Sequence, residues 1–164
     1  MLEQLEWCQK ALCNFLEEKR AKFPRFYFIG DDDLLEILGQ AQNPAVIQAH
    51  LKKLFQGTTT VRFNKTMTKI QSMVSAAGEV VDLDHAVATS DRVEDWLSAF
   101  ADEMKSTLAS LLASYLLSLT KTGEVNFEMY PSQVMCIGEL VQFTDSVESS
   151  IGNGFTDLLI KVKS

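Results

Sequence analysis

Apolar residues recur at intervals of three and four over most of this chain, a spacing typical of amphipathic α-helices. Leu5, Cys8, Leu12, Phe15 and Leu16 fall on one face of such a helix, which we expect to be a core face. The pattern is already running at Leu2, so we expect the chain to be a fragment of a larger protein. The helices predicted by this spacing span about residues 2–22, 33–39, 44–56, 91–119 and 131–151.

The period changes between residues 58 and 87, where Thr, Val and Phe become frequent. Short runs at 61–63, 69–74 and 79–83, with a turn around Gly78, predict a β-hairpin or three-stranded meander over residues 61–87. A hairpin of this kind is marginal alone and must pack on helices. The fold class predicted is therefore mostly α, a single elongated helical bundle over residues 1–164 with one inserted hairpin.

Two of the predicted helices carry further expectations. In 91–119, Asp91 and Glu94 fit a capping box, and Leu112 and Leu116 widen the apolar stripe, so its second half is expected to be buried on two sides. Asn43 is expected to cap the helix that Pro44 opens. After 131–151, a last short helix is expected over residues 155–162.

A rigid corner is predicted between the first two helices, at residues 23–38. Pro24 stops the preceding helix, and the aromatic run 26–29 indicates a buried strand or extended strut. Gly30 then turns the chain, and one of the three following aspartates is expected to cap the next helix. The residues predicted to form this corner, as a structural joint, hinge or interface, are Phe23, Pro24, Arg25 and Phe26, followed by Asp31, Asp32 and Asp33.

The three aspartates also raise a metal site as an alternative. Asp31 and Asp33 could occupy positions 1 and 3 of an EF-hand loop, but position 12 would then be Gln42, where the loop requires a bidentate glutamate. Helix capping and compensation of the helix dipole are the simpler explanation. The sequence therefore predicts no metal site here.

The net charge of the chain argues against two classes of binding partner. The 164 residues carry a net charge of −7, which argues against binding to nucleic acid and to an anionic membrane surface. No apolar run is long enough to span a bilayer. The cysteines, Cys8, Cys13 and Cys136, are odd in number and lack CxxC spacing, which favours a reduced intracellular environment.

A search for chemistry finds no catalytic constellation. The chain contains neither GxxxxGK[ST] nor GxGxxG, so it carries no P-loop and no dinucleotide fingerprint. His50 and His85 lie on different predicted elements without another ligand at metal-binding spacing, so each is expected to be a surface residue or a hydrogen-bonded one. We therefore expect no catalytic residue, no metal and no cofactor in this chain.

Several blocks of the sequence closely resemble one known family, the linker region (N-terminal region 2) of dynein heavy chains. They lie at residues 5–20, 23–39, 43–55 and 78–81, then at 93–97 with 103–105, and at 131–134 with 143–144 and 147–148, in the family's order. Within the family the sequence of these blocks is most similar to the cytoplasmic dynein 2 class, the retrograde motor of cilia. The chain departs from the pattern at 58–69, 116–130 and after 152.

The resemblance implies a mechanical role. In dynein the linker is a curved rod of helical bundles that crosses a ring of AAA+ modules, changes shape as ATP is bound and hydrolysed, and drives movement along microtubules. It implies that ATP and Mg²⁺ bind in the ring of the parent heavy chain, and that the partners are that ring, the remaining linker helices, the dynein subunits and the microtubule. The implied locations are the cytoplasm, the cytoskeleton and the cilium or axoneme.

The predicted hairpin is the candidate contact with the ring, and its candidate residues are Lys69, Gly78 and Glu79. Two other function classes stay open at this point. A free-standing helical protein-binding module would show an exposed apolar groove, and an enzyme built from dispersed residues would show a pocket with perturbed ionisable groups.

Overall fold

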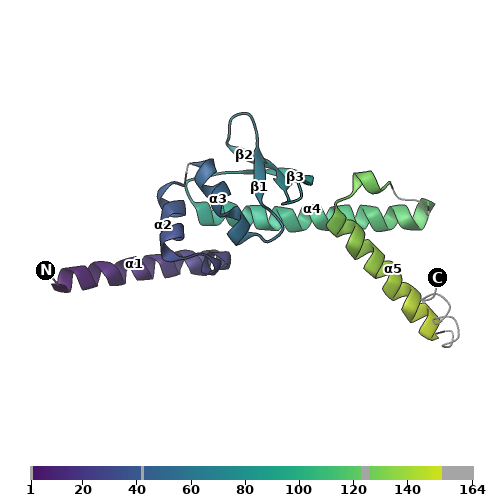
Figure 1. Cartoon of the computed structure of the whole chain (residues 1–164), viewed down its shortest axis with the longest axis horizontal. Helices are drawn as coiled ribbons and strands as arrows, with labels where there is room; N and C mark the ends of the chain where they lie inside the picture. Colours follow the sequence, from purple (N-terminus) through teal and green to yellow (C-terminus); the bar gives the residue numbers. More distant parts are fainter. Residues whose placement is uncertain (1, 42, 123–125, 153–164) are drawn as a thin grey trace. The chain divides into compact units, whose positions relative to one another are not determined.

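The computed structural model describes residues 2–41, 43–122 and 126–152 (Figure 1). It divides into two compact units, with the boundary between Ser106 and Thr107 inside a long helix. Each unit is described by itself. The described part is mostly helical with one small antiparallel sheet, as the sequence predicts.

Helices form the N-terminal half of the first unit. They are α1 (Leu2–Lys22), the 3-10 helix η1 (Pro24–Phe28), α2 (Asp31–Gly39) and α3 (Pro44–Leu54). Helix α1 ends before Pro24, which has no N–H to continue the ladder. At the start of α3 the Asn43 side chain accepts a hydrogen bond from the Ala45 amide, and Pro44 occupies the first turn, which confirms the predicted cap.

The sheet is a three-stranded antiparallel meander in the order β1-β2-β3, which confirms the predicted insertion. Its strands are β1 (Thr60–Phe63), β2 (Lys69–Val74) and β3 (Val80–Ala88). Gly78 has a φ of +84°, so the β2–β3 turn requires a glycine. The sheet lies beside α3 and the first part of α4 (Val93–Thr122) (Figure 1). The backbone amide of His85 donates to Glu103 Oε1 of α4 over 2.7 Å.

Two details of the predicted corner are wrong. Residues 24–28 form η1 rather than a strand or strut, and of this segment Phe26 is buried while Tyr27 and Phe28 are exposed. Helix α2 begins at Asp31 with Gly30 at its N-cap and no side-chain cap bond. The aspartates therefore occupy the first helical turn, where their negative charge interacts favourably with the positive end of the helix dipole.

The capping box predicted at the start of α4 is also replaced by another arrangement. The helix begins at Val93, two residues after Asp91, and the Glu94 carboxylate bonds Lys19 of α1. The first turns of α4 contribute the most buried residues of this region, with Val93, Leu97 and Phe100 fully buried. The N-terminal part of α4 is therefore an integral part of the first unit's core.

The second unit consists of α4 residues 107–122, η2 (Phe127–Met129) and α5 (Ser132–Gly152). Tyr115 is fully buried and its hydroxyl donates to Glu139 Oε1 over 3.2 Å. Gly138 lies so close to the Tyr115 ring that a Cβ there would clash with it. Leu112 and Leu116 are only half-buried, so the prediction of burial on two sides is wrong for this chain. The short helix predicted at 155–162 lies outside the described residues.

Two helices leave apolar faces uncovered. On α1 only Leu16 is buried, so the expected core face is wrong for the rest of that helix. No helix in the described ranges is apolar over enough of its length to cross a bilayer. The large apolar residues exposed on these helices are Leu2, Leu5, Trp7, Leu12 and Phe15 on α1 and Ile137, Leu140, Phe143 and Ile151 on α5.

Candidate functional site

The predicted corner is built around a chain of four buried phenylalanine rings. The Phe23 and Phe26 centroids are 5.0 Å apart and edge-to-face, and Phe23 lies 6.3 Å from Phe55. Phe55 in turn meets Phe100 edge-to-face at 5.3 Å. Edge-to-face pairs are favourable because the positive edge of one ring meets the negative face of the other. The cluster joins the end of α1, η1, the end of α3 and the start of α4.

Arg25 packs against the Phe55 ring of this cluster. Its Nη1 donates to the carbonyl oxygen of Leu54 over 2.9 Å, and its guanidinium lies 4.7 Å from the centroid of the Phe55 ring. The carbonyls of the last helical turn have no partner within the helix, so Arg25 satisfies one of them and also makes a cation–π contact. Of the predicted corner residues, the structure thus brings Phe23, Arg25 and Phe26 together at the C-terminal end of α3.

Two of the three aspartates link helices. Asp31 Oδ1 lies 2.5 Å from Arg20 Nη2 and connects α2 to α1, whereas Asp33 Oδ2 lies 2.6 Å from Lys53 Nζ and connects α2 to α3. The Lys53 bond lowers the pKa of Asp33 below its ordinary value. Asp32 is exposed. The aspartate run therefore acts through cross-helix ion pairs rather than through the cap that the sequence predicts.

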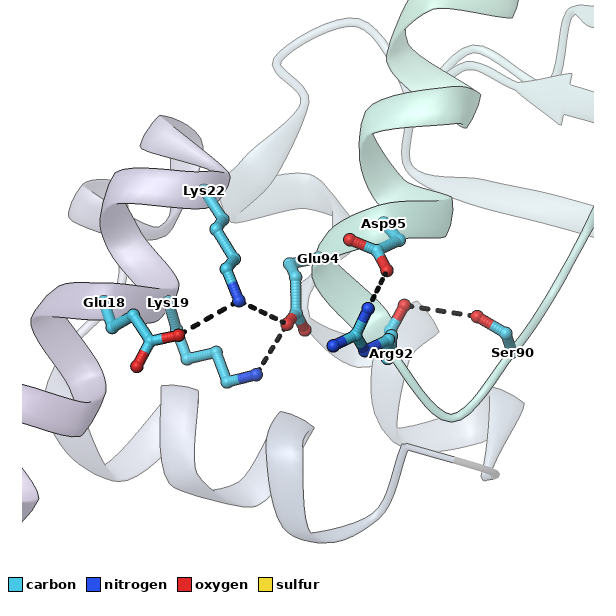
Figure 2. Close-up of polar contacts among 7 residues, drawn as sticks. All are labelled: Glu18, Lys19, Lys22, Ser90, Arg92, Glu94 and Asp95. Atoms are coloured by element: carbon cyan, nitrogen blue, oxygen red, sulfur yellow. Dashed lines mark hydrogen bonds and ion pairs between the residues drawn. The ribbon is translucent and has the colours of Figure 1, made fainter.

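A buried carboxylate that the sequence analysis missed joins α1 to α4. Figure 2 shows Lys19 and Lys22 of α1 pointing toward Glu94 in the first turn of α4. The Glu94 side chain is 2% exposed, and its Oε1 lies 2.5 Å from Lys19 Nζ and 4.0 Å from Lys22 Nζ. In sequence Glu94 resembles a capping-box residue, and no local pattern indicates a partner 75 residues away.

The environment of Glu94 has opposing effects on its pKa. Burial raises the pKa of the carboxyl, but the Lys19 hydrogen bond, its own backbone amide and the charges of both lysines together lower it below the ordinary value. A carboxylate with a lowered pKa in the folded state stabilises the fold at neutral pH. This ion pair therefore holds α1 against α4 over the neutral range.

The predicted ring-contact residues lie at different ends of the hairpin. Lys69 begins β2 and pairs with Ala88, whereas Gly78 and Glu79 form the turn between β2 and β3. The structure therefore does not bring Lys69 together with the other two. A ring contact at this hairpin remains a prediction.

The two histidines lie as the sequence predicts, one at the surface and one in a hydrogen bond. His85 is exposed, with Nδ1 3.3 Å from Glu103 Oε1. His50 is buried between α2 and α3, with Nε2 3.2 Å from Glu36 Oε2. All three cysteines are free and exposed.

Replacing Phe26 by alanine tests the aromatic cluster, and Phe28 two residues later is the matched control. Phe26 is 0% exposed and Phe28 is 71% exposed. We expect Phe26→Ala to lower the free energy of unfolding by about 3 kcal/mol, through lost burial and a cavity, and Phe28→Ala to change it by far less. Urea denaturation followed by circular dichroism measures both values. Equal losses in the two variants would contradict the cluster's role.

Replacing Glu94 by glutamine tests the buried ion pair. We expect Glu94→Gln to lower the free energy of unfolding at pH 7 by about 2 kcal/mol, because Lys19 loses a charged hydrogen-bond partner. The contribution of Glu94 is complete above the unfolded carboxyl pKa and disappears as the pH falls through its lowered folded pKa. The variant should therefore lose less stability on acidification than the unmodified chain.

Asp95 is the matched control for Glu94. It is the next residue along α4, it is exposed, and its partner Arg92 Nη1 lies 3.4 Å away (Figure 2). Asp95→Asn should change the unfolding free energy by well under 1 kcal/mol. Denaturation curves recorded from pH 3 to 7 compare both variants, and a pH dependence of Glu94→Gln identical to that of the parent chain would refute the assignment.

Comparison with known proteins identifies the family. The family described as "Dynein heavy chain, N-terminal region 2" matches residues 1–115. The chain is 52% identical over 158 residues to the cytoplasmic dynein 2 heavy chain 1 of Caenorhabditis elegans, covering 96% of the chain and 4% of that relative. Identity to the human protein of the same name is 51% over 152 residues, covering 92% of the chain and 4% of that relative.

The match extends to a green alga and to another class of dynein. The cytoplasmic dynein 2 heavy chain 1 of Chlamydomonas reinhardtii is 48% identical over 160 residues, covering 96% of the chain and 4% of that protein. The axonemal heavy chain 5 of Rattus norvegicus is 38% identical over 168 residues, covering all of the chain and 5% of that protein. The chain thus spans about one twenty-fifth of the length of the cytoplasmic dynein 2 relatives. It belongs to the dynein heavy chain N-terminal region 2 family.

Proposed function

We propose that this chain is a non-catalytic segment of a dynein linker, the lever that couples ATP-driven changes of the AAA+ ring to movement toward microtubule minus ends in intraflagellar transport. The observation that carries the proposal is the corner that joins α1, η1, α3 and α4 through one aromatic cluster. A lever transmits force only if its elements resist separation. The corner supplies such resistance.

The polar contacts at the corner support the same role. The Lys19–Glu94 bond joins residues 75 positions apart, and the Arg25–Leu54 bond joins residues 29 positions apart. Such links between distant segments allow a displacement of α1 to be passed to α3 and α4. A switching element needs packed units of this kind, because packed cores move between discrete arrangements rather than bending continuously.

The remaining assignments are proposals for the whole protein, and family membership is what supports them. In this proposal ATP and Mg²⁺ bind in the ring of the parent heavy chain, and the lack of a P-loop motif in this sequence is consistent with it. Its direct partners are that ring and the remaining linker helices, and the complete motor adds dynein subunits and the microtubule. The places of action are the cytoplasm, the cytoskeleton and the cilium.

The uncovered apolar face of α1 fits packing against further linker helices. Leu5, Leu12 and Phe15 expose large apolar surfaces on this face, and such surfaces mark contacts with other proteins or segments. The same face favours a second candidate, a free-standing helical protein-binding module. The two functions differ in whether the corner affects motor speed.

Arg25→Ala in the complete heavy chain tests the lever function. We expect slower microtubule gliding with nearly unchanged ATP hydrolysis, because the corner loses the bond to Leu54 and the contact with Phe55. Arg92→Ala is the matched control, because Arg92 is exposed. In Figure 2 its guanidinium contacts Asp95, over 3.4 Å. Unchanged gliding speed with Arg25→Ala would favour the binding module over the lever.

The proposed ring contact at the hairpin has its own test. Replacing the 75–79 turn, which includes Gly78 and Glu79, by a two-residue Asn-Gly turn keeps the strands but removes these two residues. If the turn contacts the ring, ATP hydrolysis and gliding should become uncoupled in the complete motor. Lys69→Ala at the other end of the hairpin is the comparison, and preserved coupling in the turn variant would exclude a ring contact there.

A further inference from the structure

A cluster of potential metal ligands lies between α2 and α3, away from the aromatic rings. Asp33 and Glu36 are three residues apart on α2 and so share a face, and His50 faces them from α3. One ligand atom from each residue lies within 4.8 Å of the others. Helix α2 carries four acidic residues and no basic one, which favours a cation beside it.

His50 supplies the observation that points to a ligand. The residue is 7% exposed, and its Nδ1 is buried without a hydrogen-bond partner among the described residues. Asp33 Oδ1 lies 3.7 Å from Nδ1, which is too long for a hydrogen bond. An unpaired buried nitrogen is unfavourable, so this geometry has a place for a partner between Nδ1 and Asp33.

The spacing suits a divalent metal ion. Two ligand atoms that each lie about 2.0–2.2 Å from a tetrahedral zinc ion are separated by roughly 3.4 Å, close to the observed Nδ1–Oδ1 distance. The other ring nitrogen, Nε2, lies 3.2 Å from Glu36 Oε2. Metal-binding histidines usually donate their second N–H to a carboxylate in this way, which fixes the ring and its tautomer.

We propose that His50 Nδ1 and the Asp33 carboxylate bind a zinc ion, with water completing the coordination and Glu36 acting as a positioning residue for the imidazole. The ion would bridge α3 to α2. No loop motif in the sequence shows this site, because the histidine comes from the next helix rather than from the aspartate run.

Lys53 is the group that opposes the ion. Its ammonium lies 2.6 Å from Asp33 Oδ2, the oxygen opposite the one that faces His50. The Lys53 side chain is 52% exposed, so it can move into solvent when a cation arrives. Removing this charge should strengthen zinc binding, an effect that adventitious binding elsewhere on the chain would not show.

The test is calorimetric titration of ZnCl₂ into the 164-residue chain carrying Cys8→Ser, Cys13→Ser and Cys136→Ser, since exposed thiols bind zinc themselves. We expect saturable binding at one site and a rise in melting temperature with zinc. His50→Gln should weaken binding at least tenfold. His85→Gln should not, although His85 also faces a carboxylate, because it is exposed.

Further variants separate binding from folding. Asp33→Asn replaces His50→Gln if that variant fails to fold by circular dichroism, and it should likewise weaken zinc binding at least tenfold. Lys53→Met should tighten binding, whereas Glu36→Gln should weaken it about 10- to 100-fold. A purely structural Glu36 would lower the zinc-free melting temperature without changing the zinc dissociation constant. Absence of saturable binding, or binding unchanged by the loss of His50 or Asp33, would overturn the proposal.

Discussion

Four phenylalanine rings from separate segments of the chain converge at one place, and the first unit depends on their burial. Removal of apolar surface from water is non-directional, so it brings α1, η1, α3 and α4 together without selecting their exact contacts. The polar groups around the cluster supply the selection. Arg25 donates to the carbonyl oxygen of Leu54, and Lys19 donates to Glu94, so these groups fix which parts of the segments meet.

The sequence predicted the elements far better than the contacts. Spacing located the α-helices of the described ranges, with their ends correct to within about three residues, and Asn43–Pro44 marked the start of α3 correctly. The two 3-10 helices were not predicted as helices. The run 26–29 was misassigned as a strand, because a short aromatic segment has no period that separates strand from helix. The partners of Glu94 lie in a distant helix, and the single sequence holds no record of that pairing.

The spacing of apolar residues also predicted an apolar face on α1, but it did not predict which segment covers that face. Leu16 is buried, whereas Leu5 and Leu12 on the same predicted face are exposed. The aspartates show a similar limit. Their charge at the start of α2 was predicted, but their ion pairs with Arg20 and Lys53 depend on how three helices approach one another. Patterns along a chain describe faces, and only the fold assigns their partners.

In the second unit, the contact of Gly138 with the Tyr115 ring is a point about which α5 could rotate. Gly138 lies in the first half of α5, and the helix continues for 14 further residues to Gly152. At the rise of an α-helix this stretch is about 21 Å long. Gly138 is only six residues from the first residue of α5. A rotation of the helix about the contact with Tyr115 would therefore displace its C-terminal end further than its N-terminal end.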